Sequence, residues 1–196
     1  MDTQRKQLTF VAAFFVAAFA VSGYVAYLNR TPSPRRVAAH VASWPAGPRR
    51  TVTMLTERYG PPNVLARGIA TWSNRKPWKR IVVRGDASDA YLEQTVSYAA
   101  PREALASLRE FGRGVRVNLE ANELTAASSD ESLNRLALNL AVQIAVGKRS
   151  VADARDFYAK TTRLSTAGKS SPYLTGLLFA PYRAAEVDRR RRGVGY

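Results

Sequence analysis

Residues 8–28, LTFVAAFFVAAFAVSGYVAYL, contain no charged side chain and decide how the chain is organised. At a rise of about 1.5 Å per residue, a helix of this length covers the roughly 30 Å hydrocarbon core of a bilayer. Tyr24 and Tyr27 suit the membrane interface, and Arg30 follows them. The run predicts one N-terminal membrane-spanning helix over residues 1–29, followed by a soluble domain.

A cleaved secretory signal is the alternative interpretation of the same run. Arg5 and Lys6 supply its basic start, and residues 18–20 form a small-residue cleavage site. The apolar stretch continues well past that site, which favours an uncleaved span. Ala13 and Ala17 lie one helical turn apart, so they allow close approach of another helix, and we expect them to contact a neighbouring span.

The chain is strongly basic, with 30 Lys and Arg against 15 Asp and Glu and a net charge of +15. Such a protein binds anionic surfaces, and beside a membrane anchor the nearest are lipid headgroups, so no nucleic acid is expected. The sequence has no cysteine, which excludes disulfides, thiol catalysis and cysteine-based metal sites. His40 is the one histidine and is interpreted as incidental.

Residues 30–47 are rich in Pro and Arg and are interpreted as a connector with a short helical turn at 37–41. Trp44 within it has two interpretations, at the headgroup level or packed on the domain. Residues 48–164 are predicted to form one α+β domain, near the usual domain size.

Apolar periodicity predicts an α+β fold with a small antiparallel sheet of about four strands, covered on one face by helices. The stretch 69–84 predicts a β-hairpin with a polar turn. Two closely joined helices, preceded by Ser129 and Ser150 as N-caps, predict a C-terminal αα-hairpin. Helical spacing occurs at residues 48–59, 101–111, 129–147 and 150–158, and alternation at 69–84, 92–98, 115–119 and 124–126.

The tip of the predicted hairpin concentrates aromatic and basic side chains. Membrane-surface loops place Trp at the interface and Lys or Arg on headgroups, and partner contacts use the same types. A core position for both indoles, with the cations at the rim, is the alternative. The predicted contact residues are Trp72, Arg75, Lys76, Trp78, Lys79 and Arg80.

Residues 165–196 are predicted to be a basic docking tail. Its apolar part, residues 173–179, would lie on a partner or on the bilayer, and a disordered basic tail is the alternative. Beyond the apolar part lie Arg189, Arg190, Arg191 and Arg192.

No constellation of residues predicts a named chemistry, so we expect no enzymatic activity, no cofactor and no metal. Residues 168–170 (GKS) resemble the end of a phosphate-binding loop, but Arg163 stands where that loop needs glycine. The acidic residues of the loops are interpreted as solvated; these are Asp86, Asp89, Glu93, Glu120 and Glu123.

The short stretches that resemble known proteins are 59–62 (YGPP), Trp72, 77–80 (PWKR), 92–94 (LEQ), Tyr98, 136–141 (LALNLA), 147–148 (GK) and 154–158 (ARDFY). They resemble a family of small exported bacterial proteins without an assigned activity. The resemblance covers about residues 52–158, implies export and a bacterial source, and carries over no catalytic residue. Residues 85–90 depart from the family, whose members have acidic and histidine-rich residues in that loop.

These observations predict a non-catalytic, single-span accessory subunit of a larger bacterial membrane complex, respiratory or photosynthetic, that stabilises neighbouring subunits. The alternative is a membrane-tethered module that binds anionic lipid or polymer. Charges flanking the span slightly favour a cytoplasmic domain. The export-like start and the family resemblance favour the periplasm, so the prediction is a single-pass inner-membrane protein with a periplasmic domain.

Overall fold

The computed structural model describes residues 32–181. The predicted span over residues 1–29, with Ala13 and Ala17, lies outside the described residues. So do the four tail arginines, Arg189, Arg190, Arg191 and Arg192. None of the helices within residues 32–181 has the length and hydropathy that a membrane span requires.

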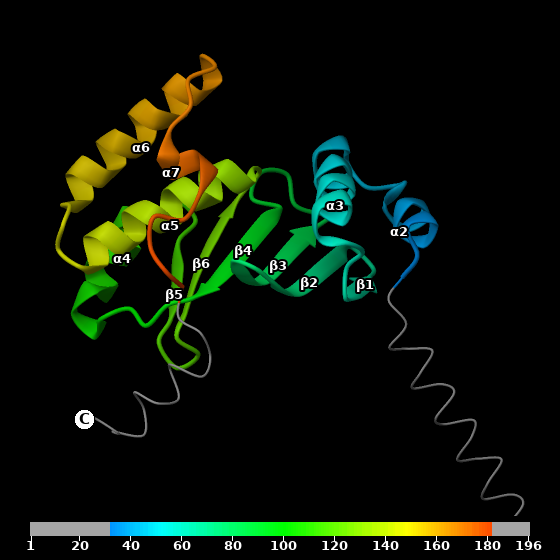
Figure 1. Cartoon of the computed structure of the whole chain (residues 1–196), viewed down its shortest axis with the longest axis horizontal. Helices are drawn as coiled ribbons and strands as arrows, with labels where there is room; N and C mark the ends of the chain where they lie inside the picture. The colour runs from blue at the N-terminus through cyan, green and yellow to red at the C-terminus, as the bar shows by residue number, and fades with distance from the viewer. Residues whose placement is uncertain (1–31, 182–196) are drawn as a thin grey trace, which may run out of the picture. The chain divides into compact units, whose positions relative to one another are not determined.

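A six-stranded antiparallel sheet forms the centre of the domain, with the strand order β1-β2-β3-β4-β6-β5 (Figure 1). The predicted α+β class with an antiparallel sheet is confirmed, although the sheet has more strands than expected. The sequence did not predict β1, because its three residues, VLA, are all apolar and show no alternation. The strands are β1 Val64–Ala66, β2 Ile69–Arg75, β3 Trp78–Arg84, β4 Leu92–Ser97, β5 Arg116–Asn118 and β6 Glu123–Ser128.

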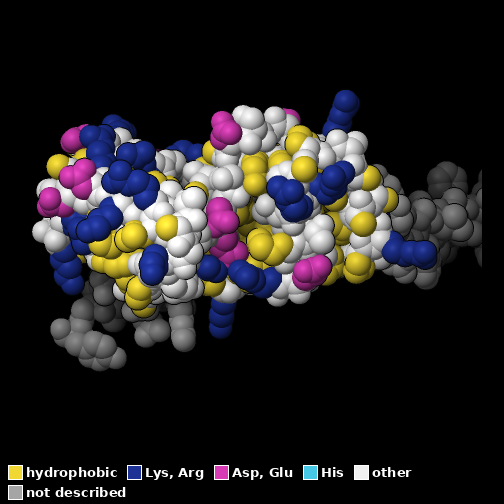
Figure 2. All heavy atoms as spheres, turned by 90° about the horizontal axis from the view of Figure 1, so that it is seen from above, with side chains coloured by type: hydrophobic (Ala, Val, Ile, Leu, Met, Phe, Trp, Pro, Cys, Tyr) yellow, Lys and Arg dark blue, Asp and Glu magenta, His cyan; other side chains and the backbone are white. Residues whose placement is uncertain are grey.

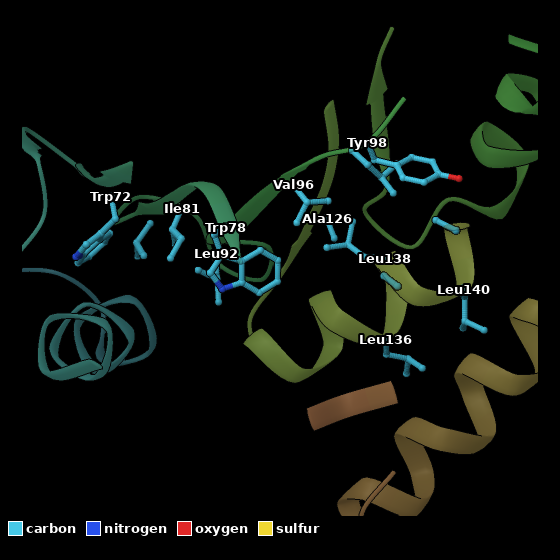
Figure 3. Packing of buried hydrophobic residues seen from close by; sticks show 14 of the residues in the cluster. Trp72, Trp78, Ile81, Leu92, Val96, Tyr98, Ala126, Leu136, Leu138 and Leu140 are labelled. Atoms are coloured by element: carbon cyan, nitrogen blue, oxygen red, sulfur yellow. The ribbon is translucent and has the colours of Figure 1, made fainter. Parts of the chain in front are cut away.

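Helices cover one face of this sheet. α3 packs against β3, and α5 packs against β4 and β6. In Figure 3 the labelled side chains of the sheet point toward the side on which the helices lie, which is where the core forms. The helices are α2 Pro34–Val41, α3 Ala46–Tyr59, the 3-10 helix η1 Arg102–Ala104, α4 Leu105–Phe111, α5 Glu131–Ala145, α6 Val151–Thr166 and α7 Pro172–Thr175.

The two long C-terminal helices begin close to where the sequence places them. The hydroxyl of Ser150 accepts a hydrogen bond from the backbone N–H of Asp153, as expected of an N-cap. The cap of α5 is Asp130 rather than Ser129, and it accepts from the backbone N–H of Ser132. α6 follows α5 after a short connection and packs against both α5 and α4.

Residues 33–47, interpreted from the sequence as a connector, belong to the same compact unit as the sheet. Val37 and Val41 lie four residues apart on α2 and are 3% and 2% exposed. The ring of Trp44 packs on the domain, where a Cβ atom on Gly85 would lie only 2.4 Å from it. The sequence did not predict the apolar side of α2, because the prolines and arginines around it are typical of a connector.

The apolar stretch 173–179 also lies on the domain itself, not on a partner or bilayer as the sequence predicted. Asn139 on α5 donates to the carbonyl oxygens of Tyr173 and Gly176 at 3.1 and 2.8 Å, and accepts from the backbone N–H of Leu178 at 2.7 Å. Leu174 is buried. The stretch is apolar because it completes the core over α5.

Candidate functional site

The hairpin predicted over residues 69–84 is formed by β2 and β3, with Trp72 opposite Ile81 and Arg75 opposite Trp78. Both indoles lie in the core, where Trp72 is 0% and Trp78 is 1% exposed. The Nε1 atom of Trp72 donates to the Gly60 carbonyl oxygen at 2.8 Å, and that of Trp78 to the Tyr59 hydroxyl at 3.2 Å. Because these partners satisfy the polar edge of each ring, the indoles are structural and present no contact surface.

The four basic residues near the tip separate into two pairs. Lys79 and Arg80 both bind the Glu123 carboxylate on β6, through Nζ and Nη2 at 3.0 Å each. Arg75 and Lys76 remain at the turn, where Lys76 is exposed. The structure therefore brings together only half of the predicted basic cluster, and it does so over a carboxylate.

A second carboxylate extends this arrangement along the sheet. Glu93 on β4 accepts from Nε of Arg84 at 3.1 Å and from Nη2 of Arg116 at 2.8 Å. Residues in a strand alternate between faces, so Glu93 lies on the face opposite Leu92 and Val96, the buried apolar residues of β4. Between the two carboxylates, the hydroxyls of Thr95 and Thr125 are hydrogen bonded at 2.9 Å.

We call the group Arg80, Arg84, Arg116, Glu93 and Glu123 the arginine face; it lies on the side of the sheet away from α3 and α5. Its arginine side chains are 43%, 43% and 56% exposed, whereas the Glu93 and Glu123 side chains are 19% and 10% exposed. The carboxylates thus lie beneath the cations. The guanidinium groups are therefore more accessible to solvent than the carboxylates are.

Local electrostatics keep Glu123 charged. Burial alone would raise the pKa of Glu123, but hydrogen bonds from Lys79 and Arg80 and the charges of those two residues lower the pKa below its ordinary value. The carboxylate is therefore ionised at neutral pH and holds both cations in place.

The arginine face can bind acidic groups. Each guanidinium has five N–H donors, and the carboxylates occupy only some of them. The remaining donors belong to half-exposed side chains that the ion pairs already restrain, and arginine pairs with carboxylates in a bidentate geometry. Among residues 32–181, no group of three His, Asp or Glu side chains could hold a metal ion.

Sequence reasoning missed Glu93 and Glu123, which it interpreted as solvated. Arg116 is 23 residues from Glu93 and Arg80 is 43 residues from Glu123, and the order β3-β4-β6-β5 is what brings these pairs together. The signal available in the sequence was alternation. It places Glu93 opposite Leu92, and Glu123 opposite Leu124, on the face away from the core.

Comparisons of the chain with family models, with curated proteins and with solved structures found no match. The resemblance to small exported bacterial proteins accordingly stays a prediction. The arginine face is the feature of the described residues from which a function can be argued.

Proposed function

We propose that this protein is a non-catalytic, single-span accessory subunit of a larger bacterial membrane complex, with its domain on the periplasmic side. In this proposal, residues 8–28 anchor the chain and the arginine face binds acidic side chains of a neighbouring subunit. The observation that supports it is a row of half-exposed arginines held in place by two nearly buried carboxylates.

Restraint of these side chains favours binding. Ordering a long side chain at an interface costs roughly 0.5–1.5 kcal/mol, and this cost is reduced where the side chain is already held before the partner arrives. Arg84 and Arg116 are both held by Glu93, and Arg80 is held by Glu123. These arginines would therefore lose little side-chain entropy when an acidic partner binds.

The membrane anchor would also favour association with a partner. A domain tethered to the same bilayer as its partner meets it at a raised effective concentration, so modest contacts suffice for stable association. The charge of +15 makes an acidic partner surface the electrostatic match. These contacts would stabilise the neighbouring subunits without any chemical step.

Purification of the tagged full-length chain in mild detergent tests this proposal. We expect it to migrate in native electrophoresis with other membrane proteins, and to separate from them as the salt concentration rises. A monomer at every detergent and salt concentration would contradict the proposal.

A membrane-tethered module for anionic lipid or polymer is the second candidate, and the overall charge favours it. Each basic side chain near an anionic membrane contributes about 1 kcal/mol, and the interaction falls off within a Debye length. Flotation with vesicles of mixed zwitterionic and anionic lipid separates the candidates. If the protein is such a module, its domain should bind to vesicles that contain anionic lipid without any protein partner.

A further inference from the structure

A cleft of about 480 Å³ lies between α3 and the first turn of α5, on the helix side of the sheet. Small-molecule sites in proteins have volumes of roughly 300–1,000 Å³. Seen from above in Figure 2, acidic side chains near the middle of the domain are flanked by basic and apolar ones. The cleft has the size and the mixed lining of a ligand site.

Glu131 lies in the wall of this cleft and is nearly buried, with 5% of its side chain exposed. Its carboxylate accepts from Arg58 at 3.1 Å, from the Tyr59 hydroxyl at 3.2 Å and from Arg135. The charge of Glu131 raises the pKa of Arg58, although partial burial opposes this. Glu131 thus holds two of the arginines that line the cleft through ion pairs.

Three other groups that line the cleft are free to bind a ligand. Arg50, the Tyr91 hydroxyl and the Ser129 hydroxyl have no hydrogen-bond or ion-pair partner within residues 32–181. All three are donors. The first turn of α5 is not the source of the site, because Asp130 already caps it.

The charges that line the cleft select the ligand. Arg50, Arg58 and Arg135 face two carboxylates, those of Asp130 and Glu131, which leaves one positive charge unmatched. A singly charged anion balances that charge, whereas a dianion such as phosphate meets more repulsion from the same two carboxylates.

The lining also includes two apolar side chains, those of Met54 and Leu92, of which Met54 is 38% exposed. We propose that this cleft binds a small organic monocarboxylate, with its carboxylate on Arg50 and Tyr91 and its apolar stem against Met54. A guanidinium and a hydroxyl are the donors that arginine-based carboxylate sites use.

This inference goes beyond the proposed function and does not depend on it. The cleft shares no residue with the arginine face, which lies on the other side of the sheet. A failure of either proposal leaves the other standing.

Methionine methyl resonances provide a direct measurement. The chain has two methionines, Met1 and Met54, and Met54 lines the cleft, so the full-length protein labelled with [¹³C-methyl]methionine in zwitterionic micelles carries a reporter there. Met54→Leu assigns the signals. We expect butyrate to shift the Met54 signal saturably, and butanol and inorganic phosphate at matched ionic strength to leave it in place.

Variants of the cleft complete the test. Arg50→Gln should weaken butyrate binding by about tenfold, the loss of one charge-assisted hydrogen bond, and Tyr91→Phe by less. Arg109→Gln, an exposed arginine of α4, is the matched control and should bind as the wild type does. Thermal unfolding of each variant checks that it folds. Absence of a saturable shift with butyrate, equal binding of phosphate, or unchanged binding by Arg50→Gln would each overturn the inference.

Discussion

Arg80 on β3 binds Glu123 on β6 at 3.0 Å, across the strand β4 that separates them. Arg116 on β5 reaches across β6 to Glu93 in the same way. These two ion pairs therefore join strands that are not hydrogen bonded to each other, whereas Arg84 binds Glu93 from the neighbouring strand β3. This cross-strand arrangement restrains the arginines and distinguishes the arginine face from a surface of independent basic side chains.

The Glu123 carboxylate should stabilise the domain in a pH-dependent manner. Because the partners of Glu123 are 40% and 43% exposed, solvent screens the interaction, and we expect Glu123→Gln to lower the free energy of unfolding by only about 1 kcal/mol at pH 7. The pKa of Glu123 is depressed on folding, so this stabilisation is complete above the ordinary pKa of about 4.3 and is lost as the pH falls through the lower, folded value.

Urea unfolding of the full-length chain at pH 7 and at acid pH measures this difference. The gap between wild type and Glu123→Gln should narrow as the pH falls below about 4.3. Glu103→Gln, at an exposed position of η1, is the control and should show little gap at either pH. A gap of constant size would contradict a role for ionised Glu123.

Trp72 should behave as a core residue and not as a contact residue. The side chain is fully buried, so Trp72→Ala should lower the free energy of unfolding by about 3–5 kcal/mol. Denaturant unfolding followed by far-UV circular dichroism checks this. Normal stability combined with loss of partner binding would restore the interpretation of this indole as a contact.

Gly114 should tolerate alanine far less well than Gly147 does. Both have positive φ, +73° and +70°, but a Cβ atom on Gly114 would lie 2.1 Å from the carbonyl oxygen of Ala127, whereas one on Gly147 meets no atom within 4 Å. Gly147→Ala should therefore cost about 1–2 kcal/mol of backbone strain alone. Thermal unfolding should show a clearly larger loss for Gly114→Ala, and equal losses would argue against this approach of β6 to the loop.

Asn139 should hold residues 173–179 on α5. Asn139→Ala removes three of the hydrogen bonds to that stretch, while Gln143→Ala removes one of them, the bond to the Tyr173 hydroxyl, together with its bond to Arg149. Limited chymotrypsin digestion should cut near Tyr173 and Phe179 much faster in Asn139→Ala than in Gln143→Ala. Equal cleavage rates would show that Leu174 and its apolar contacts alone hold the stretch.

Local patterns predicted much of this fold. The alternation around Trp72 and Ile81 predicted the hairpin, and Ser150 with Asp153 predicted the start of α6. Each of these signals is local, because its residues lie close together in the sequence. Residues 33–47 were misinterpreted since their prolines and arginines are typical of a connector, whereas Val37, Val41 and Trp44 are the residues among them that face the core.

The candidate sites depend on contacts that no local pattern encodes. Glu93 and Arg116 form an ion pair because their strands, β4 and β5, both pair with β6. Arg50 and Ser129 line the same cleft although they are far apart in the sequence. The sequence alone could not distinguish a buried position from an exposed one for Trp72 and Trp78 either. An indole beside basic residues fits both a core edge and a surface loop.

The size of the detergent-extracted complex formed by Arg84→Gln/Arg116→Gln tests the central claim most directly, with Arg102→Gln/Arg109→Gln as a control of equal charge change. Circular dichroism verifies that both variants fold. The arginine face predicts that the first variant leaves the complex and migrates alone, while the control stays with its partners. A first variant that folds and remains in a complex of wild-type size would contradict the account.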